Sequence, residues 1–259
     1  MIHLTIHKRI IILILIQSLR KLLYSFCLII GYYLRDNKKI TNKNRIIDDH
    51  SNWRTSSRVA DYLNRVDKIP HRTEGELLLC EFISNKTRRI LDLGTGNGRL
   101  IKLLKEKIPT VESVAIDFSP PMLNEFKREF LNDDTIKIIE HDLTYPLPTN
   151  LGKFDAIVSN FAIHHLMHNR KKDLYSEIFA ILKPGGIFCN LDHISSESKK
   201  INQYFRKVMG RRPINKEHGK RLTKIHIQLK WLLEIGFVDV DCYWRWLEFA
   251  LLIGFKPSN

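Results

Sequence analysis

The sequence lacks long hydrophobic runs and has few cysteines. Its 259 residues include four cysteines, Cys27, Cys80, Cys189 and Cys242, which form no C-x-x-C pair. This scatter argues against a zinc site or a disulfide scaffold and favours a reducing, cytoplasmic compartment. Acids and histidines also lack ligand spacing, so we expect no metal. The cysteines are expected to be small buried apolar residues.

The N-terminal 50 residues differ from the rest of the chain. Their apolar runs, 10–16 and 22–34, are each shorter than the ~18–20 residues that span a bilayer. Basic residues precede the first run as in a signal peptide, but no small-residue cleavage site follows. Three interpretations stay open for residues 1–50: a membrane-associating extension, a mispositioned translation start, or a helix packed on the domain. The polar stretch 35–49 predicts a linker, so the domain is expected to span 51–259.

Basic residues are concentrated in two segments. The net charge is +14; residues 1–50 contain nine Lys and Arg against three Asp and Glu, and residues 197–230 contain eleven against two. The remainder is nearly neutral. Such basic segments suit nucleic acid or an anionic membrane surface, or they form a solvated face.

One short stretch, residues 89–100, organises the chain. An apolar run ends in Asp92, glycines follow at alternate positions, and leucines then recur at helical spacing. The pattern predicts a buried strand, a tight turn and a helix, which frame a nucleotide-type site in an open α/β sheet. Arg99 occupies the place of the third glycine of the dinucleotide fingerprint, and Asp92 would repel phosphate but suit a cationic ligand. A turn without a ligand is the alternative.

A second apolar run ends in Asp117, about one βα unit downstream. A carboxylate at the end of this strand is placed to accept hydrogen bonds from ribose hydroxyls. Ser119 is expected to cap the next helix, with Pro120 at its first position. Strands are expected over 88–93, 113–117, 135–140, 154–160 and 186–192, and helices over 98–106, 120–131 and 170–182. This alternation predicts a doubly wound, mostly parallel α/β sheet with helices on both faces.

With these residues in view, the chain from about Trp53 onward resembles the class I S-adenosylmethionine-dependent methyltransferases. The resemblance rests on residues 92–98, Asp117, residues 140–143, residues 154–166 and residues 182–186, in family order. It implies a Rossmann-like seven-stranded sheet whose last strand is antiparallel, completed by strands near 238–244 and 249–256. It also implies S-adenosyl-L-methionine as cofactor.

The resemblance also implies roles for individual residues. It assigns Asp92, Gly94, Thr95, Gly96, Asn97 and Gly98 to the methionine part of the cofactor, Asp117 to the ribose, Phe118, Met122, Asp142 and Leu143 to the adenine, and Asn160 and Phe161 to the point of methyl transfer. His164 and His165 are the candidate catalytic residues, since a neutral imidazole can accept a proton near pH 7. A purely structural role for this histidine pair is the alternative.

Two flanking segments are candidates for substrate control. Residues 51–84 are expected to be helices that fold over the cofactor as a lid, with Arg72 or Tyr62 closing on cofactor or substrate. Residues 195–219 are expected to be a basic cap insertion, and its mixture of aromatics and cations suits an anionic small molecule or single-stranded RNA. A helix over 222–235, with Leu232 and Leu233 on one apolar face, should end at Gly236.

We therefore predict a methyltransferase that moves the methyl group of S-adenosylmethionine to a small-molecule acceptor by direct displacement. Two alternatives remain: an RNA (tRNA-type) methyltransferase that uses the basic insertion, and a catalytically idle cofactor-binding scaffold.

Overall fold

The computed structural model describes residues 51–210 and 216–258. The predictions for residues 1–50, and for Arg211 and Arg212 in the basic insertion, lie outside this part of the chain. Within the described residues, every helix is too short or too polar to cross a membrane.

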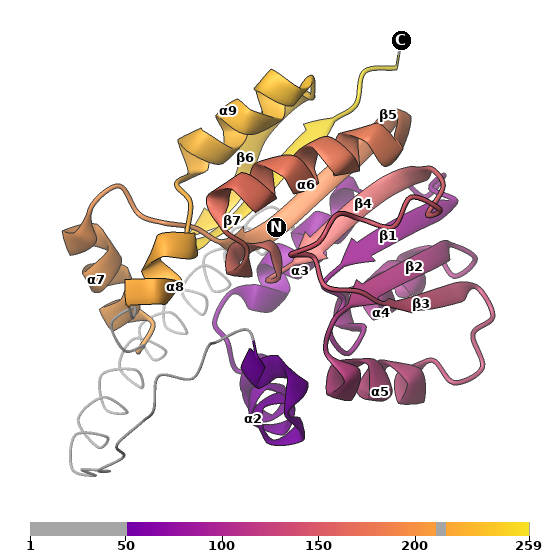
Figure 1. The fold of residues 1–259 in the computed structure, drawn as a ribbon, viewed down its shortest axis with the longest axis horizontal. Helices are drawn as coiled ribbons and strands as arrows, with labels where there is room; N and C mark the ends of the chain where they lie inside the picture. The colour runs from indigo at the N-terminus through magenta and orange to yellow at the C-terminus, as the bar shows by residue number, and fades with distance from the viewer. Residues whose placement is uncertain (1–50, 211–215, 259) are drawn as a thin grey trace, which may run out of the picture. The chain divides into compact units, whose positions relative to one another are not determined.

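A seven-stranded sheet forms the centre of the domain, in the order β3-β2-β1-β4-β5-β7-β6 (Figure 1). Parallel pairing runs through the first five positions, whereas β7 is antiparallel to both of its neighbours. The predicted Rossmann-like, mostly parallel sheet with one antiparallel strand is therefore confirmed. The strands are β1 (Arg89–Leu93), β2 (Glu112–Asp117), β3 (Ile136–Glu140), β4 (Phe154–Asn160), β5 (Leu182–His193), β6 (Val238–Trp246) and β7 (Phe249–Phe255).

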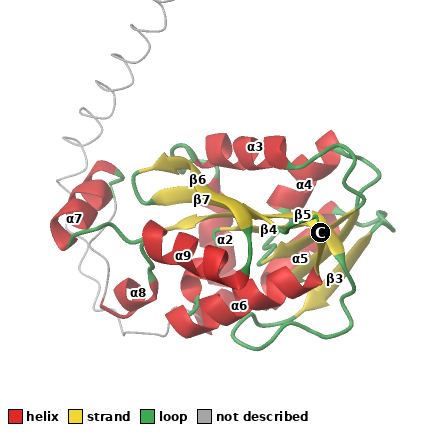
Figure 2. Cartoon of the chain, turned by 90° about the horizontal axis from the view of Figure 1, so that it is seen from above, coloured by secondary structure: helices red, strands yellow, loops and turns green. Residues whose placement is uncertain are grey.

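Helices cover both faces of this sheet (Figure 2). The first described segment forms the 3-10 helix η1 (Ser51–Arg54) and the helix α2 (Ser56–Val66). The helices that follow are α3 (Arg72–Phe82), α4 (Arg99–Lys107), α5 (Pro120–Glu129), α6 (His168–Ile181), α7 (Lys199–Val208), α8 (Lys216–Arg221) and α9 (Ile225–Ile235), with a short 3-10 helix η2 (Ile163–His165) after β4. In Figure 2, α3 and α4 lie on one side of the sheet and α6 and α9 on the other.

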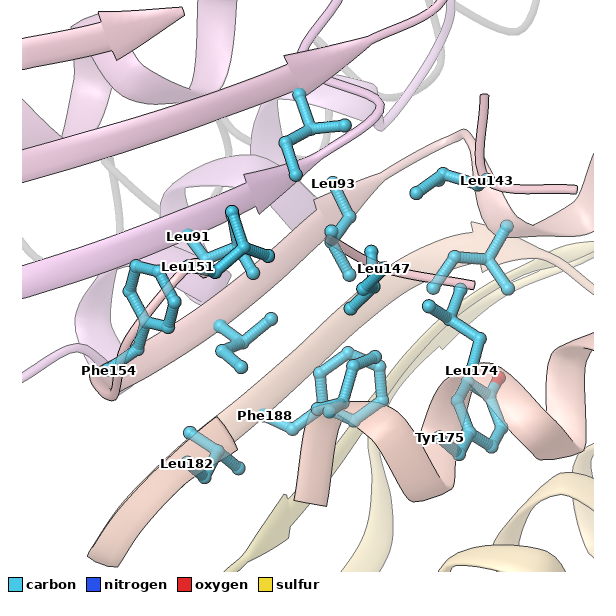
Figure 3. Packing of buried hydrophobic residues seen from close by; sticks show 14 of the residues in the cluster. Leu91, Leu93, Leu143, Leu147, Leu151, Phe154, Leu174, Tyr175, Leu182 and Phe188 are labelled. Atoms are coloured by element: carbon cyan, nitrogen blue, oxygen red, sulfur yellow. The ribbon is translucent and has the colours of Figure 1, made fainter. Parts of the chain in front are cut away.

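Two large apolar clusters fill the space between sheet and helices. One joins β1, β4 and β5 to α6 and α9, and it includes Tyr175 and Phe188 (Figure 3). The other lies under α3 and α4 and includes Leu79 and Leu104, both fully buried. Cys80 and Cys189 are buried in this second cluster as expected, whereas Cys242 is only half-buried on the edge strand β6.

Local sequence signals set several element ends. Ser119 accepts a hydrogen bond from the Met122 amide at 3.4 Å and Pro120 opens α5, as predicted. Gly236 ends α9 in the left-handed region, with φ of 114°.

Three boundary or packing predictions were wrong. β5 begins at Leu182 rather than at 186, because Leu182 pairs with Phe154 across an irregularity in the ladder. The helix expected from 222 begins at Ile225. Leu233 is 57% exposed and does not share the buried position of Leu232.

Replacing Gly94 with Ala is expected to destabilise the fold through a steric clash with Ala162. Gly94 has φ of +73°, and a Cβ there would lie 2.1 Å from the Cβ of Ala162, where the chain leaves β4. Gly210 has a similar φ of +63° with nothing within 4 Å of an added Cβ, so Gly210→Ala is a matched control. We expect Gly94→Ala to lower the free energy of unfolding by about 2 kcal/mol more than the control, measured by urea denaturation. Equal losses would show that only backbone conformation matters.

Candidate cofactor site

The carboxyl ends of β1, β2 and β4 meet at the glycine-rich turn. The amides of Gly94 and Thr95 donate to the carbonyl of Ile116 at 2.8 and 2.9 Å, so β2 fixes the start of the turn. An added Cβ at Gly98 would clash with Phe126 and Phe130, whereas at Gly96 the nearest atom is the Met122 Sδ at 3.9 Å. Gly94 and Gly98 therefore pack against protein. Gly96 is the glycine of the turn with the most room beside its Cα, where a ligand can approach the backbone closely.

Asp92 is a buried acid, and one of its two carboxylate oxygens has no hydrogen-bond partner among the described residues. Its Oδ2 accepts the Thr95 hydroxyl at 2.7 Å, while no described residue hydrogen-bonds its Oδ1. Burial raises the pKa of Asp92 to about 7, the Thr95 hydroxyl opposes this, and the nearby Asp117 charge adds to it. A buried acceptor without a partner is costly, so Asp92 suits a ligand that brings a donor or a positive charge.

Asp117 holds the turn through both carboxylate oxygens. The Gly96 amide donates to Oδ2 at 2.8 Å and the Ser119 amide to Oδ1 at 2.9 Å. Burial raises the pKa of Asp117 against these hydrogen bonds, and the charge of Asp142 adds to the rise. Because each oxygen has a second lone pair, the carboxylate retains acceptor capacity for ligand hydroxyls.

The predicted adenine residues lie around Asp117. Met122 is buried beside Gly96, and the guanidinium of Arg54 lies over the Phe118 ring at 5.7 Å. Asp142 accepts the amide and hydroxyl of Thr144 at 2.9 and 2.8 Å, which fixes the turn after β3. Leu143 is buried in the apolar cluster. These residues give the site a largely apolar wall with acids at its rim.

Asn160 and Phe161 end β4 on the other side of the turn. Asn160 donates to Glu76 at 2.8 Å, and its buried Oδ1 has no partner among the described residues. Phe161 has a positive φ of 56°, and its ring lies 4.7 Å from the Arg72 guanidinium. A second unused buried acceptor therefore lies at this end of the sheet. Asn97 is half-exposed in the turn.

The buried carboxylate of Glu76 connects α3, the start of α4 and the end of β4. No role was predicted for this residue from the sequence. Glu76 is fully buried and accepts Arg72 Nε and Arg99 Nε at 2.7 Å and Asn160 Nδ2 at 2.8 Å. Arg72 also donates to the Tyr62 hydroxyl at 2.7 Å. Arg99, which replaces the third glycine of the dinucleotide pattern, thus ties the start of α4 to α3. In the sequence, the signal that could have identified Glu76 was segment 71–76, which places two acids close to Arg72.

The two candidate catalytic histidines lie beside another carboxylate, Asp192. Asp192, at the end of β5, accepts the His164 amide at 2.7 Å, and its other oxygen lies 2.5 Å from His164 Nδ1. Burial raises the pKa of Asp192, and His193 and Lys171 oppose this. The rings of His164 and His165 lie 4.0 Å apart. Sequence reasoning missed Asp192, although it is an acid at a strand end like Asp92 and Asp117.

The 3-10 helix η1 connects the two sides of the site. The Ser119 hydroxyl donates to the carbonyl of Trp53 at 2.5 Å, and the Trp53 and His165 rings lie 6.1 Å apart. By contrast, α3 belongs to the layer that covers the sheet, since Leu79 and Ile83 are fully buried there. Among residues 51–210 and 216–258, no group of three His, Cys, Asp or Glu side chains could hold a metal ion.

The chain matches one family model and many known proteins. Residues 90–186 match a model described as "Methyltransferase domain". The carboxy-S-adenosyl-L-methionine synthase of Nautilia profundicola is 26% identical over 222 residues, covering 76% of this chain and 89% of that protein. The demethylmenaquinone methyltransferase of Thermus thermophilus is 38% identical over 101 residues, covering 38% of this chain and 44% of that protein.

Solved structures share the fold at lower identity. The human N-acetylserotonin methyltransferase in complex with SAM has a TM-score of 0.59 at 18% identity, covering 79% of this chain and 57% of that one. An O-methyltransferase family protein from Burkholderia thailandensis has a TM-score of 0.63 at 16% identity, covering 93% and 70%. At these identities the likeness shows the fold alone.

Proposed function

We propose a small-molecule acceptor for this enzyme, which belongs to the class I S-adenosylmethionine-dependent methyltransferases. Its cofactor is S-adenosyl-L-methionine, whose sulfonium supplies an activated methyl group. The acceptor, and the roles of individual residues, are our proposals.

The proposed roles follow the geometry of the turn. Asp92 and Thr95, with the backbone from Gly94 through Asn97 to Gly98, hold the methionine part. Asp117 accepts the ribose hydroxyls, and Phe118, Met122, Asp142 and Leu143 surround the adenine. Asn160 and Phe161 line the point of transfer. The observation that carries this proposal is the pair of buried acceptors, Asp92 Oδ1 and Asn160 Oδ1, left without described partners near the carboxyl ends of the paired strands β1 and β4.

His164 and His165 are proposed to act on the acceptor side of the same site. The Asp192 carboxylate beside His164 Nδ1 favours a proton on that nitrogen, which makes Nε2 the acceptor. In-line positioning of the nucleophile supplies the remaining acceleration. If one imidazole takes up the acceptor proton, either His164→Gln or His165→Gln lowers methyl transfer without changing cofactor affinity. Unchanged transfer in both variants would leave the pair a structural role.

Cofactor affinity is expected to fall in acid. The pKa of Asp92, raised by burial to about 7, means that the unliganded protein holds a proton there below neutrality. The cofactor ammonium needs the ionised form, so affinity for S-adenosylhomocysteine should fall about tenfold per pH unit below ~7. The same raised pKa makes its full contribution to the stability of the unliganded fold below the ordinary carboxyl pKa of 3.8, and this contribution is lost progressively as the pH rises from there to about 7. Calorimetric titration with S-adenosylhomocysteine at pH 6 and 8 measures the expected fall in affinity. Asp92→Asn should remove the pH dependence of this affinity. A slope that persists in Asp92→Asn would contradict the assignment.

The acceptor can be identified with the full-length protein, methyl-labelled cofactor and a cell extract. Label on a small molecule other than the cofactor or a modified form of it supports our proposal. Label in RNA supports the tRNA-type alternative, which rests on the basic segment 195–219. No label with cofactor bound favours the idle scaffold.

One comparison favours a second candidate. Carboxy-S-adenosyl-L-methionine synthases match this chain over 65–76% of its length. In that case a carboxyl donor in the extract would modify the cofactor itself, and mass spectrometry of the same reaction would reveal its carboxylated form.

Within residues 51–84, we propose that η1 and α2 form the lid, because α3 packs on the sheet.

A further inference from the structure

We propose that α7 docks the enzyme on an anionic phospholipid surface through an apolar face that points away from the domain. This inference concerns binding and does not depend on the identity of the acceptor. Figures 1 and 2 show α7 set apart from the helices that cover the sheet. It is a ten-residue helix with a regular start, since the Ser198 hydroxyl accepts the Ile201 amide at 3.2 Å.

The apolar side chains of α7 share one side of the helix. At 100° per residue, Ile201, Tyr204, Phe205 and Val208 fall within about a third of the circumference. Ile201 is 41% exposed, Tyr204 63% and Val208 52%, and α7 contains no buried residue. These three side chains are exposed in the described part of the structure, and Phe205 is half-buried. A helix of a globular domain normally turns its apolar side inward, so α7 has the reverse orientation.

One polar residue on the other side of α7 contacts the domain. Arg206, on the opposite side from Ile201 and Val208, lies 3.4 Å from both carboxylate oxygens of the fully buried Glu248. The ring of Phe205, at the edge of the apolar arc, lies 5.8 Å from the Arg245 guanidinium. These contacts hold the helix with its apolar face outward.

The positive charge of α7 and of the segment around it indicates an anionic partner. Lys199, Lys200 and Lys207 are exposed on α7, which contains no acid. The surrounding segment 197–230 carries eleven Lys and Arg against two Asp and Glu. A basic helix with one aliphatic face is the pattern that lies in the interface of an anionic bilayer. Residues 1–50 are also basic, so they do not complement α7 in charge. Tyr204 could stack on a base, but Ile201 and Val208, which form the rest of the exposed face, cannot, so the face favours a lipid surface over RNA.

The test measures the emission of a dye attached at position 204, because residues 1–50 could bind vesicles separately and a simple binding assay would not distinguish the two. In a full-length Cys27→Ser, Cys242→Ser background, Tyr204→Cys is labelled with an environment-sensitive nitrobenzoxadiazole dye. The remaining Cys80 and Cys189 are buried. The control places the same dye at Leu233→Cys, which is 57% exposed on α9. With vesicles containing about 30% phosphatidylglycerol, we expect emission at 204 to rise ~threefold and shift to the blue.

The same rise should be smaller with pure phosphatidylcholine and should weaken with salt. Adding Ile201→Asp and Val208→Asp should abolish it, whereas adding Leu131→Asp, at an exposed site elsewhere, should not. An emission change at 204 no larger than at 233 would overturn the proposal. A change that appears without vesicles as protein concentration increases would overturn it in favour of a second copy of the chain. A response to single-stranded RNA alone would overturn it in favour of nucleic acid.

Discussion

An Asp117→Ala variant is expected to bind S-adenosylhomocysteine about a hundredfold more weakly than the unaltered protein. Two losses combine. The ribose hydroxyls lose a charged acceptor, and the amides of Gly96 and Ser119 lose the carboxylate that holds them at 2.8 and 2.9 Å. Calorimetric titration measures the total loss, and thermal unfolding of the variant reports whether the fold survives.

A modified ligand separates the two losses. The unaltered protein should prefer S-adenosylhomocysteine over its 2′-deoxy form, because Asp117 is proposed to accept the ribose hydroxyl. In Asp117→Ala this preference should disappear. If the variant binds both ligands more weakly but keeps the preference, Asp117 only supports the turn and the ribose assignment is wrong.

The largest expected loss of stability comes from Glu76→Ala. The change removes a fully buried carboxylate and leaves Arg72, itself 5% exposed, without its ion-pair partner. Arg99 and Asn160 also lose an acceptor. Breaking a buried ion pair by deleting one partner typically costs about 3–5 kcal/mol, and we expect a loss in that range by urea denaturation.

The same helix offers a matched control. Glu81 also lies on α3, its side chain is 78% exposed, and its nearest cation, Lys107, is 3.9 Å away. Glu81→Ala should therefore cost less than about 0.5 kcal/mol. Similar losses for the two variants would mean that Glu76 contributes no more than a surface charge. Glu76→Gln, which keeps the size and one acceptor, should fall between them.

Sequence periodicity was a good guide to the sheet and to the ends of its strands. The predicted strands over 88–93, 113–117 and 154–160 lie within one residue of β1, β2 and β4. Buried parallel strands are continuous apolar runs, and each of these ends at an acid, an amide or a glycine turn. Knowing that parallel strands end at one edge was then enough to expect Asp92, Asp117 and Asn160 near each other.

Long-range polar contacts could not be predicted in the same way. Glu76 meets Arg99 and Asn160, which are 23 and 84 residues away in the chain, and no local pattern encodes such partners. The pairing of His164 with Asp192 spans 28 residues. Leu233 fits an apolar stripe, yet its side chain remains exposed because the face of α9 that packs on the core is narrower than the stripe.

The position of β7 has a consequence for how the protein is synthesised. β7 follows β6 in the chain, yet it lies between β5 and β6 and is buried over almost its whole length. While the ribosome makes the chain, β5 therefore has no partner on one side until β7 has emerged, and β6 has no strand to join. The nascent protein thus carries an unpaired strand edge over Ile187–His193, the residues that later pair with β7. Slow synthesis of the C-terminal region would lengthen this interval and increase the demand on chaperones.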